Sequence, residues 1–168
     1  MLWHPAYVGL GSNLDEPALQ IRRALAGLAV LPETRLIRQS SLWGSKPMGP
    51  VPQPDFGNAV AGLLTGLEAA EFFAALRRLE QQLGRTAARE RWGPRRIDLD
   101  LLVFAGLRLE ADELRLPHPG IVERNFVLYP LAEVAPELMV PGCGRVRELA
   151  ARVGPEGIWR LDNETARS

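Results

Sequence analysis

Two aspartates separated by one residue, Asp98 and Asp100, are the sharpest chemical signal in the sequence. The surrounding segment, 97–104, is otherwise apolar and predicts a strand, whose side chains alternate between two faces. Both carboxylates therefore project from one face, where they repel each other unless a cation lies between them. Mg²⁺ commonly joins one or two carboxylates to substrate phosphates. The alternative is an amphipathic strand with a solvated polar face, and the pair alone favours that alternative.

The loop that precedes this strand, residues 85–96, is polar and rich in arginine. Its arginines are Arg85, Arg89, Arg91, Arg95 and Arg96. Guanidinium groups bind phosphate through paired hydrogen bonds, and the indole of Trp92 is able to cover a flat ring. Taken singly, the arginines are typical of a solvated loop and Trp92 of a packing anchor. Next to an acidic pair, the set favours a site for a polyphosphate, Mg²⁺ and a planar ligand.

A stiff loop with four prolines, at 44–54, is followed by two residues that suit a heterocycle. Phe56 offers a stacking surface, and the amide of Asn58 offers donors and an acceptor on the same face of the expected strand. The alternative places Phe56 in the core and Asn58 at a polar strand edge. Alone, these two residues favour that structural alternative.

His118 lies between two prolines, and Arg124 follows six residues later. A fixed turn is the more frequent setting for such a histidine, but both side chains are also able to donate to a phosphate. The sequence has no GxxxxGKS/T motif, no strand-to-helix GxGxxG motif and no nucleophile elbow. A phosphate site in this chain would therefore depend on side chains and metal rather than on a glycine-rich cradle.

Composition and charge indicate one globular domain over 1–168. The 168 residues are 46% hydrophobic and carry no net charge, which excludes overall disorder. The single cysteine, Cys143, excludes an internal disulfide. No apolar run is long enough to span a bilayer and the first residues lack a secretion signal, so we expect a cytoplasmic protein, with a monomer as the simplest state. A pI near 6.8 argues against a general nucleic-acid-binding protein.

The elements that must position these residues follow the order strand, helix, strand, strand, helix, strand. Short apolar runs bounded by turn residues predict strands at 6–12, 34–43, 56–64 and 97–104. We expect Asp15 to cap the first helix, and Thr65 with Glu68 to form a capping box at the second. This order predicts an α+β, ferredoxin-like βαββαβ sandwich, in which a mostly antiparallel sheet has its helices on one face. Weaker patterns predict three later elements, helices near 125–135 and 146–153 and a strand near Trp159.

One run of the sequence, Arg91-Trp92-Gly93-Pro94-Arg95-Arg96-Ile97-Asp98-Leu99-Asp100, closely resembles the signature of the hydroxymethyldihydropterin pyrophosphokinase family. The resemblance extends in the same order to segments 7–14, 53–58, 116–119 and 124–128. It implies a ferredoxin-like fold and a Mg²⁺-dependent enzyme of folate biosynthesis. Such an enzyme transfers the pyrophosphoryl group of ATP to the hydroxymethyl oxygen of 6-hydroxymethyl-7,8-dihydropterin and releases AMP.

The resemblance also implies roles for the matching positions. Asp98 and Asp100 would hold two Mg²⁺ ions. The pterin pocket would be lined by Ser45, Lys46, Met48, Phe56, Asn58 and Phe126. The two phenylalanines would sandwich the ring. The catalytic loop would carry Arg85, Trp92 and Arg95. The ATP side would include Arg77, Glu80, Trp92, Arg95, His118 and Arg124.

Several positions depart from the family's pattern. Ala87 stands where a second loop arginine is frequent, and Ser45 and Lys46 stand where threonine and proline are frequent. Glu113 and Pro119 also differ from the usual residues on the nucleotide side. Three alternatives stay open: another Mg²⁺-dependent enzyme such as a nuclease or nucleotidyl transferase, a nucleic-acid-binding module of ferredoxin-like fold, and an inactive ATP-binding relative. Two aspartates on the sheet face oppose the nucleic-acid-binding module.

Overall fold

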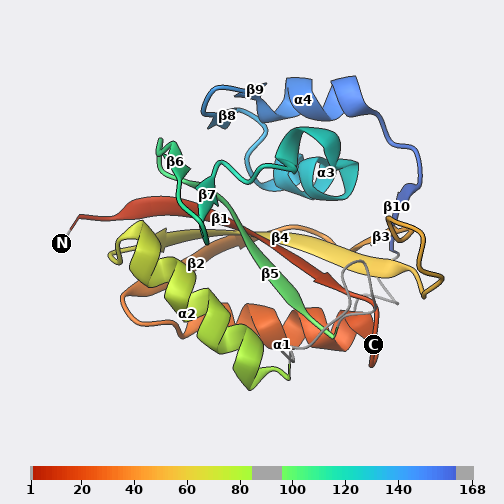
Figure 1. Ribbon diagram of the computed structural model, residues 1–168, viewed down its shortest axis with the longest axis horizontal. Coiled ribbons are helices and arrows are strands. Elements are labelled where there is room, and N and C mark those ends of the chain that lie inside the picture. The colour runs from red at the N-terminus through yellow and green to blue at the C-terminus, as the bar shows by residue number, and fades with distance from the viewer. Residues whose placement is uncertain (1, 85–95, 162–168) are drawn as a thin grey trace.

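The computed structural model describes residues 2–84 and 96–161 as an α+β structure built on one main sheet (Figure 1). The sheet strands are β1 (His4–Ser12), β2 (Thr34–Gln39), β3 (Trp43–Ser45), β4 (Phe56–Thr65), β5 (Asp98–Phe104) and β10 (Ile158–Arg160). Their order is β10-β3-β4-β1-β5, with β2 also paired to β4, and these pairings are antiparallel. The expected α+β class and mostly antiparallel sheet are confirmed.

The described residues also form four α-helices and several short elements. The helices are α1 (Pro17–Ala29), α2 (Ala69–Gln82), α3 (Asn125–Val134) and α4 (Val146–Val153). The short elements are β6 (Leu109–Glu110), β7 (Arg115–Leu116), β8 (Met139–Val140), β9 (Gly144–Arg145) and a 3-10 turn, η1 (Ile121–Glu123). Within the described ranges no helix is long and apolar enough to cross a membrane.

One face of the sheet is covered by α1 and α2, which pack on it as amphipathic helices (Figure 1). Their apolar residues recur at helical spacing, so each helix presents one stripe to the core. The buried stripes are Ile21, Leu25 and Leu28 on α1 and Phe72, Leu76 and Leu79 on α2. Against them lie the inward residues of β1 and β5, such as Val8 and Leu99. This arrangement is the two-layer packing that the sequence pattern predicts.

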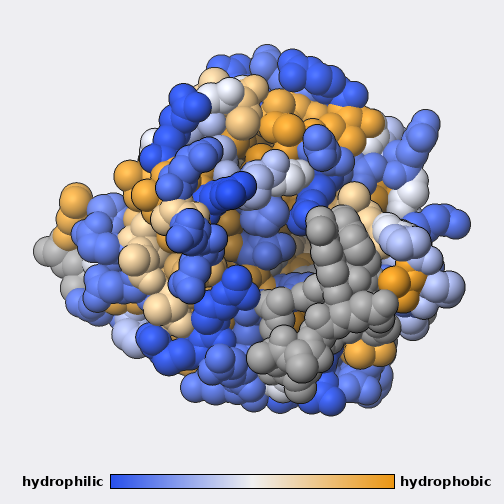
Figure 2. Space-filling view, in the orientation of Figure 1, coloured by the Kyte–Doolittle hydropathy of each residue, from blue (hydrophilic) through white to orange (hydrophobic). Residues whose placement is uncertain are grey.

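The other face of the sheet is also covered, by α3 and α4, so the prediction of helices on one face was wrong (Figure 1). Val60 of β4 and Leu102 of β5 point to this second side and are fully buried there with Leu128 and Leu131 of α3. Eight of the ten residues of β4 are buried because the strand is packed on both faces. Figure 2 shows hydrophilic side chains over most of one side of the molecule, with apolar residues gathered near α3 and α4.

The strand expected at 34–43 is divided into β2 and β3, and β3 continues to Ser45. Ser40 lies at the division. Its backbone N–H donates to the Val60 carbonyl at 2.9 Å, while its hydroxyl accepts the Val60 N–H at 2.9 Å. The side chain thus takes a place that a strand carbonyl would fill, and the chain bends without leaving β4 unpaired.

Both predicted helix caps were wrong in detail. Asp15 adopts a left-handed backbone (φ 53°), and its carboxylate accepts a hydrogen bond from Arg96 Nε at 2.8 Å instead of capping α1. At α2 the capping box joins Glu68 to Glu71. Thr65 lies too early, because the helix begins at Ala69. In each case the side chain has a partner that the local spacing does not reveal.

Candidate active site

A cavity of about 340 Å³ opens on the sheet between β1, β4 and β5 on one side and the loop after β3 and the start of α3 on the other. That volume falls within the range of small-molecule sites. It gathers eleven of the residues that the sequence singled out: Ser45, Lys46, Met48, Phe56, Asn58, Arg77, Asp98, Asp100, His118, Arg124 and Phe126. Residues from six separate segments of the chain therefore meet in one place.

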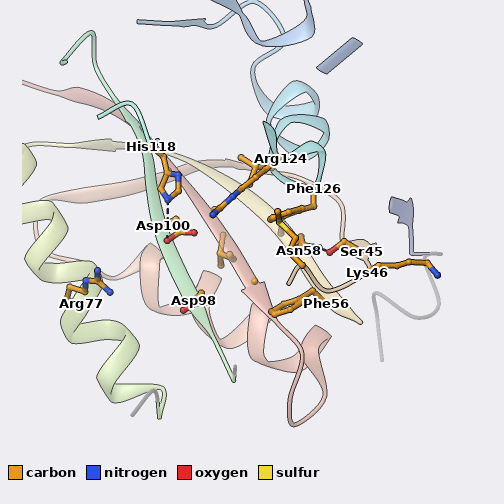
Figure 3. A pocket seen from close by; sticks show the side chains of 16 residues that line it. Ser45, Lys46, Phe56, Asn58, Arg77, Asp98, Asp100, His118, Arg124 and Phe126 are labelled. Atoms are coloured by element: carbon orange, nitrogen blue, oxygen red, sulfur yellow. Dashed lines mark hydrogen bonds and ion pairs between the residues drawn. The ribbon is translucent and has the colours of Figure 1, made fainter. Parts of the chain in front are cut away.

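One end of the cavity has the chemistry of a slot for a planar heterocycle. Phe56, from the first position of β4, and Phe126, from the first turn of α3, lie on opposite sides of Asn58 (Figure 3). Asn58 is 4% exposed and its Nδ2 donates to the Ser45 hydroxyl at 2.8 Å. This hydrogen bond fixes the amide, so a ring held between the two phenylalanines would meet oriented polar groups at its edge.

Two glycines of β1, Gly9 and Gly11, line the floor of the cavity, and neither was predicted to be a site residue. A Cβ added at Gly11 would lie 3.6 Å from Asn58 Oδ1 and would fill space over the strand. Glycines two residues apart on one strand face are the signal that could have indicated this floor, because such glycines often mark the close approach of a ligand.

The other end of the cavity is acidic, with Asp98 and Asp100 side by side on β5 (Figure 3). Leu99, between them, is 3% exposed and faces the core. The predicted alternation of the strand is thus confirmed: carboxylates lie on the cavity side and apolar residues on the helix side. Both carboxylates are half-exposed, which leaves them open to a ligand.

His118 lies next to this acidic end, with Nε2 3.9 Å from Asp100 Oδ1. The ring is held in place because its Nδ1 accepts the Gly120 N–H at 3.1 Å, and the His118 N–H donates to the Leu102 carbonyl at 2.9 Å. Burial lowers the pKa of His118; Asp100 opposes this shift and Arg124 adds to it. The imidazole is therefore neutral near pH 7 and carries its proton on Nε2, facing the aspartates.

Glu80 of α2 lies beneath the acidic strand rather than in the cavity wall. It is 1% exposed. Its Oε2 accepts the Leu99 N–H at 2.7 Å, and its Oε1 accepts a hydrogen bond from Arg77 at 3.1 Å. Arg77, half-exposed, also lines the cavity and lies over the ring of Phe73. Glu80 therefore ties α2 to the backbone between the two aspartates.

The donor set of the acidic end fits a magnesium ion. Asp98 and Asp100 supply hard oxygen ligands from one side, which leaves the remaining positions to phosphate oxygens and water. Within 2–84 and 96–161 no group of three or more histidine, cysteine, aspartate or glutamate side chains forms a metal site built by protein alone. Two neighbouring carboxylates suit a magnesium site in which the substrate supplies further ligands. The metal role of this pair stays a prediction.

Three of the expected catalytic residues, Arg85, Trp92 and Arg95, lie outside the described residues. Their roles, like those of the residues that line the cavity, stay predictions.

Comparison with known proteins places these residues in a family. Residues 7–136 match the model of 7,8-dihydro-6-hydroxymethylpterin-pyrophosphokinase (HPPK). A 2-amino-4-hydroxy-6-hydroxymethyldihydropteridine pyrophosphokinase of Pseudomonas aeruginosa is 47% identical over 155 residues, which cover 92% of this chain and 95% of the relative. A protein of the same name from Haemophilus influenzae is 38% identical over 157 residues, 94% of this chain and 98% of the relative.

Solved structures with a similar fold include the Plasmodium falciparum HPPK-DHPS wild type with STZ-DHP. The TM-score is 0.72 at 13% identity, and the match covers 95% of this chain and 47% of that one. The chain thus spans about half the length of that structure but nearly all of the two bacterial relatives. At this identity the structural likeness shows the fold alone, whereas the family match and the bacterial relatives cover most of the sequence. The chain belongs to the 7,8-dihydro-6-hydroxymethylpterin-pyrophosphokinase family.

Proposed function

We propose that this protein transfers the pyrophosphoryl group of ATP to 6-hydroxymethyl-7,8-dihydropterin and releases AMP, as a step of folate biosynthesis. One observation carries the proposal: a single cavity contains both an aromatic slot with an oriented amide and a pair of carboxylates flanked by basic groups. The family to which the chain belongs supports the same reaction. The carboxylate pair alone would also suit other Mg²⁺-dependent enzymes, and the aromatic slot alone would suit other planar ligands.

At the aromatic end, Phe56 and Phe126 hold the pterin ring between them. Asn58 and Ser45 read its polar edge, and Lys46 and Met48 complete the wall. A ring fixed in this way directs its hydroxymethyl group toward the acidic end. Holding the two reactants in one geometry removes much of the entropic cost of their encounter.

At the acidic end, the hydroxymethyl oxygen attacks the β-phosphorus of ATP. A bond forms between these atoms, the hydroxyl proton passes to water, and the bond from the β-phosphorus to the oxygen shared with the α-phosphate breaks as AMP leaves. Asp98 and Asp100 would hold two Mg²⁺ ions, which when bound supply neutralisation of phosphate charge and a lower pKa for the attacking hydroxyl. His118 donates a hydrogen bond from its Nε2–H to a phosphate oxygen, and Arg124 adds a fixed positive charge beside it.

On the ATP side, we assign Arg77 to the phosphates and Glu80 to the support of the strand that carries the aspartates. Arg85, Trp92 and Arg95 complete the ATP and catalytic set, with Arg95 on the transferring phosphates. We also propose that the chain is a single ferredoxin-like domain over 1–168, that it acts as a monomer, and that it works in the cytoplasm.

The reaction is tested by measuring AMP release from ATP and Mg²⁺ with and without 6-hydroxymethyl-7,8-dihydropterin. We expect AMP only when the pterin is present, because the hydroxymethyl oxygen is the acceptor. AMP formed at the same rate without the pterin, or pyrophosphate released instead, would contradict the proposal and favour a different phosphoryl or nucleotidyl transfer. Binding of both substrates without AMP would instead indicate an inactive relative, consistent with Ala87 in the loop.

Removing one of the two aromatic walls should weaken pterin binding. We expect Phe56→Leu and Phe126→Leu each to raise the KM for the pterin by about tenfold or more, because stacking of one planar ring on an aromatic side chain contributes about 1–3 kcal/mol. The KM for ATP should stay near the wild-type value. Tyr129→Leu is the matched control, since Tyr129 lies on the same helix but packs against Trp43 outside the cavity. Equal effects of Phe126→Leu and Tyr129→Leu would contradict the assignment.

A further inference from the structure

The C-terminal strap, which we define as residues 154–161, follows α4 and leads the chain back to the main sheet beside β3 (Figure 1). Its strand β10 pairs with β3, with Ile158 opposite Ser45 and Trp159 opposite Gly44. The Leu161 N–H donates to the Leu42 carbonyl at 3.0 Å. The strap lies beyond residues 7–136, the part of the chain that matches the family model.

The strap is also bonded to Lys46, which directly follows β3 and lines the cavity. The Lys46 N–H donates to the Gly157 carbonyl at 3.2 Å. The indole of Trp159 covers Gly44 so closely that a Cβ there would lie 2.3 Å from its Nε1. Because β3 has only three residues, its position depends on both of its neighbours, β4 and β10.

Asn125 joins this strap to the start of α3, the helix that carries Phe126. It is the first residue of α3, directly before Phe126. Its Nδ2 donates to the Gly154 carbonyl at 3.0 Å and to the Glu156 carbonyl at 2.7 Å. One amide thus uses both of its protons on the strap. A second cavity of about 210 Å³ lies at this junction, and Met48, Phe126 and Ile158 are among the residues that line it.

We propose that Asn125 is a positioning residue for the pterin. It helps to fix the position of Phe126 relative to the polar edge of the slot: the strap is paired with Ser45 and bonded to Lys46, and Asn125 ties the strap to the base of the helix that carries Phe126. The inference rests on the proposed function, because it assumes that the ring lies between Phe56 and Phe126. Asn125 touches neither substrate in this scheme and acts through the strap.

Asn125→Asp is the sharpest test, because it keeps the size of the side chain and replaces its donors by an acceptor that faces two carbonyl oxygens. A negative charge in the first turn of α3 is favourable for the helix, so the substitution should leave α3 folded. We expect the KM for 6-hydroxymethyl-7,8-dihydropterin to rise about tenfold, with kcat and the KM for ATP within about twofold of wild type. The Lys46 and Leu161 amides should exchange with deuterium faster.

Two further variants make the test decisive. Asn125→Ala loses the donors without adding charge, so it should raise the pterin KM less than Asn125→Asp; it carries the test if the charged variant does not fold. Gln39→Glu, an amide-to-acid change on exposed β2, is the matched control and should change neither quantity. Unchanged amide exchange in both Asn125 variants, or faster exchange with a wild-type pterin KM, would overturn the inference. A wild-type protein that binds no pterin would overturn the proposed function first, and the inference with it.

Discussion

Asp98→Asn and Asp100→Asn are each expected to lower kcat/KM for pyrophosphoryl transfer by about 10³-fold or more. Charge neutralisation at a metal centre is worth several kcal/mol in the transition state, and each 1.4 kcal/mol corresponds to a factor of ten. An amide keeps the size of the carboxylate but not its charge, so it no longer competes for a hard cation. The measurement is the initial rate of AMP formation at subsaturating concentrations of ATP and pterin, which gives kcat/KM, repeated as Mg²⁺ is titrated.

The fold should survive both substitutions, because the side chains are half-exposed and the buried face of β5 is formed by other residues. Asp112→Asn is the matched control, since it makes the same chemical change at an exposed residue between β6 and β7. Thermal unfolding should be cooperative and similar for all three variants. Activity within tenfold of wild type for Asp100→Asn, with the same Mg²⁺ dependence, would remove the pair from the metal site.

The acidic end of the cavity was accessible to sequence reasoning because it depends on a local rule. Alternation along one strand places Asp98 and Asp100 together and Leu99 opposite them, whatever the rest of the chain does. The pairing of Phe56 with Asn58 follows from the same rule. Phe126, from α3, closes the slot through long-range packing. Its place there was predicted from the family resemblance, because periodicity does not show which distant segments meet.

The features that local sequence patterns did not predict depend on contacts with residues far away in the sequence. Asp15 was expected to cap a helix, but its carboxylate instead accepts a hydrogen bond from Arg96, far along the chain. The strand at Trp159 was expected, yet its spacing gave no indication that it would pair with β3 beside the slot. The apolar surface of α3 indicates burial but does not specify which face of the sheet it covers. Capping and periodicity describe neighbours in sequence, whereas these features arise from neighbours in space.

Glu80 shows where a sequence signal existed and was assigned differently. It stands four residues after Leu76, so it lies on the apolar side of α2, where a carboxylate is unusual. The resemblance assigned it to the ATP side. Its burial and its bond to the Leu99 N–H instead favour an indirect contribution, through the strand that carries both aspartates.

Glu80→Ala is therefore expected to lower the free energy of unfolding by about 2–3 kcal/mol, because the buried Leu99 N–H loses its acceptor and the core loses volume. Glu80→Gln should cost less, since its amide oxygen is still able to accept that hydrogen bond. Urea unfolding followed by circular dichroism measures both. Gln81→Ala, exposed on the same helix, is the control and should stay near the wild-type stability.

The same pair of variants separates support of the strand from contact with ATP. If Glu80 acts by holding Leu99, activity should follow stability: Glu80→Ala loses kcat, because the aspartates on either side of Leu99 are less firmly placed, and Glu80→Gln retains most of it. If Glu80 instead met the nucleotide through its charge, Glu80→Gln would raise the KM for ATP as much as Glu80→Ala does. An equal rise in the KM for ATP in the two variants would contradict the supporting role of Glu80. If the KM for ATP does not rise in Glu80→Gln, Asp98 and Asp100 remain the carboxylates that meet the substrate.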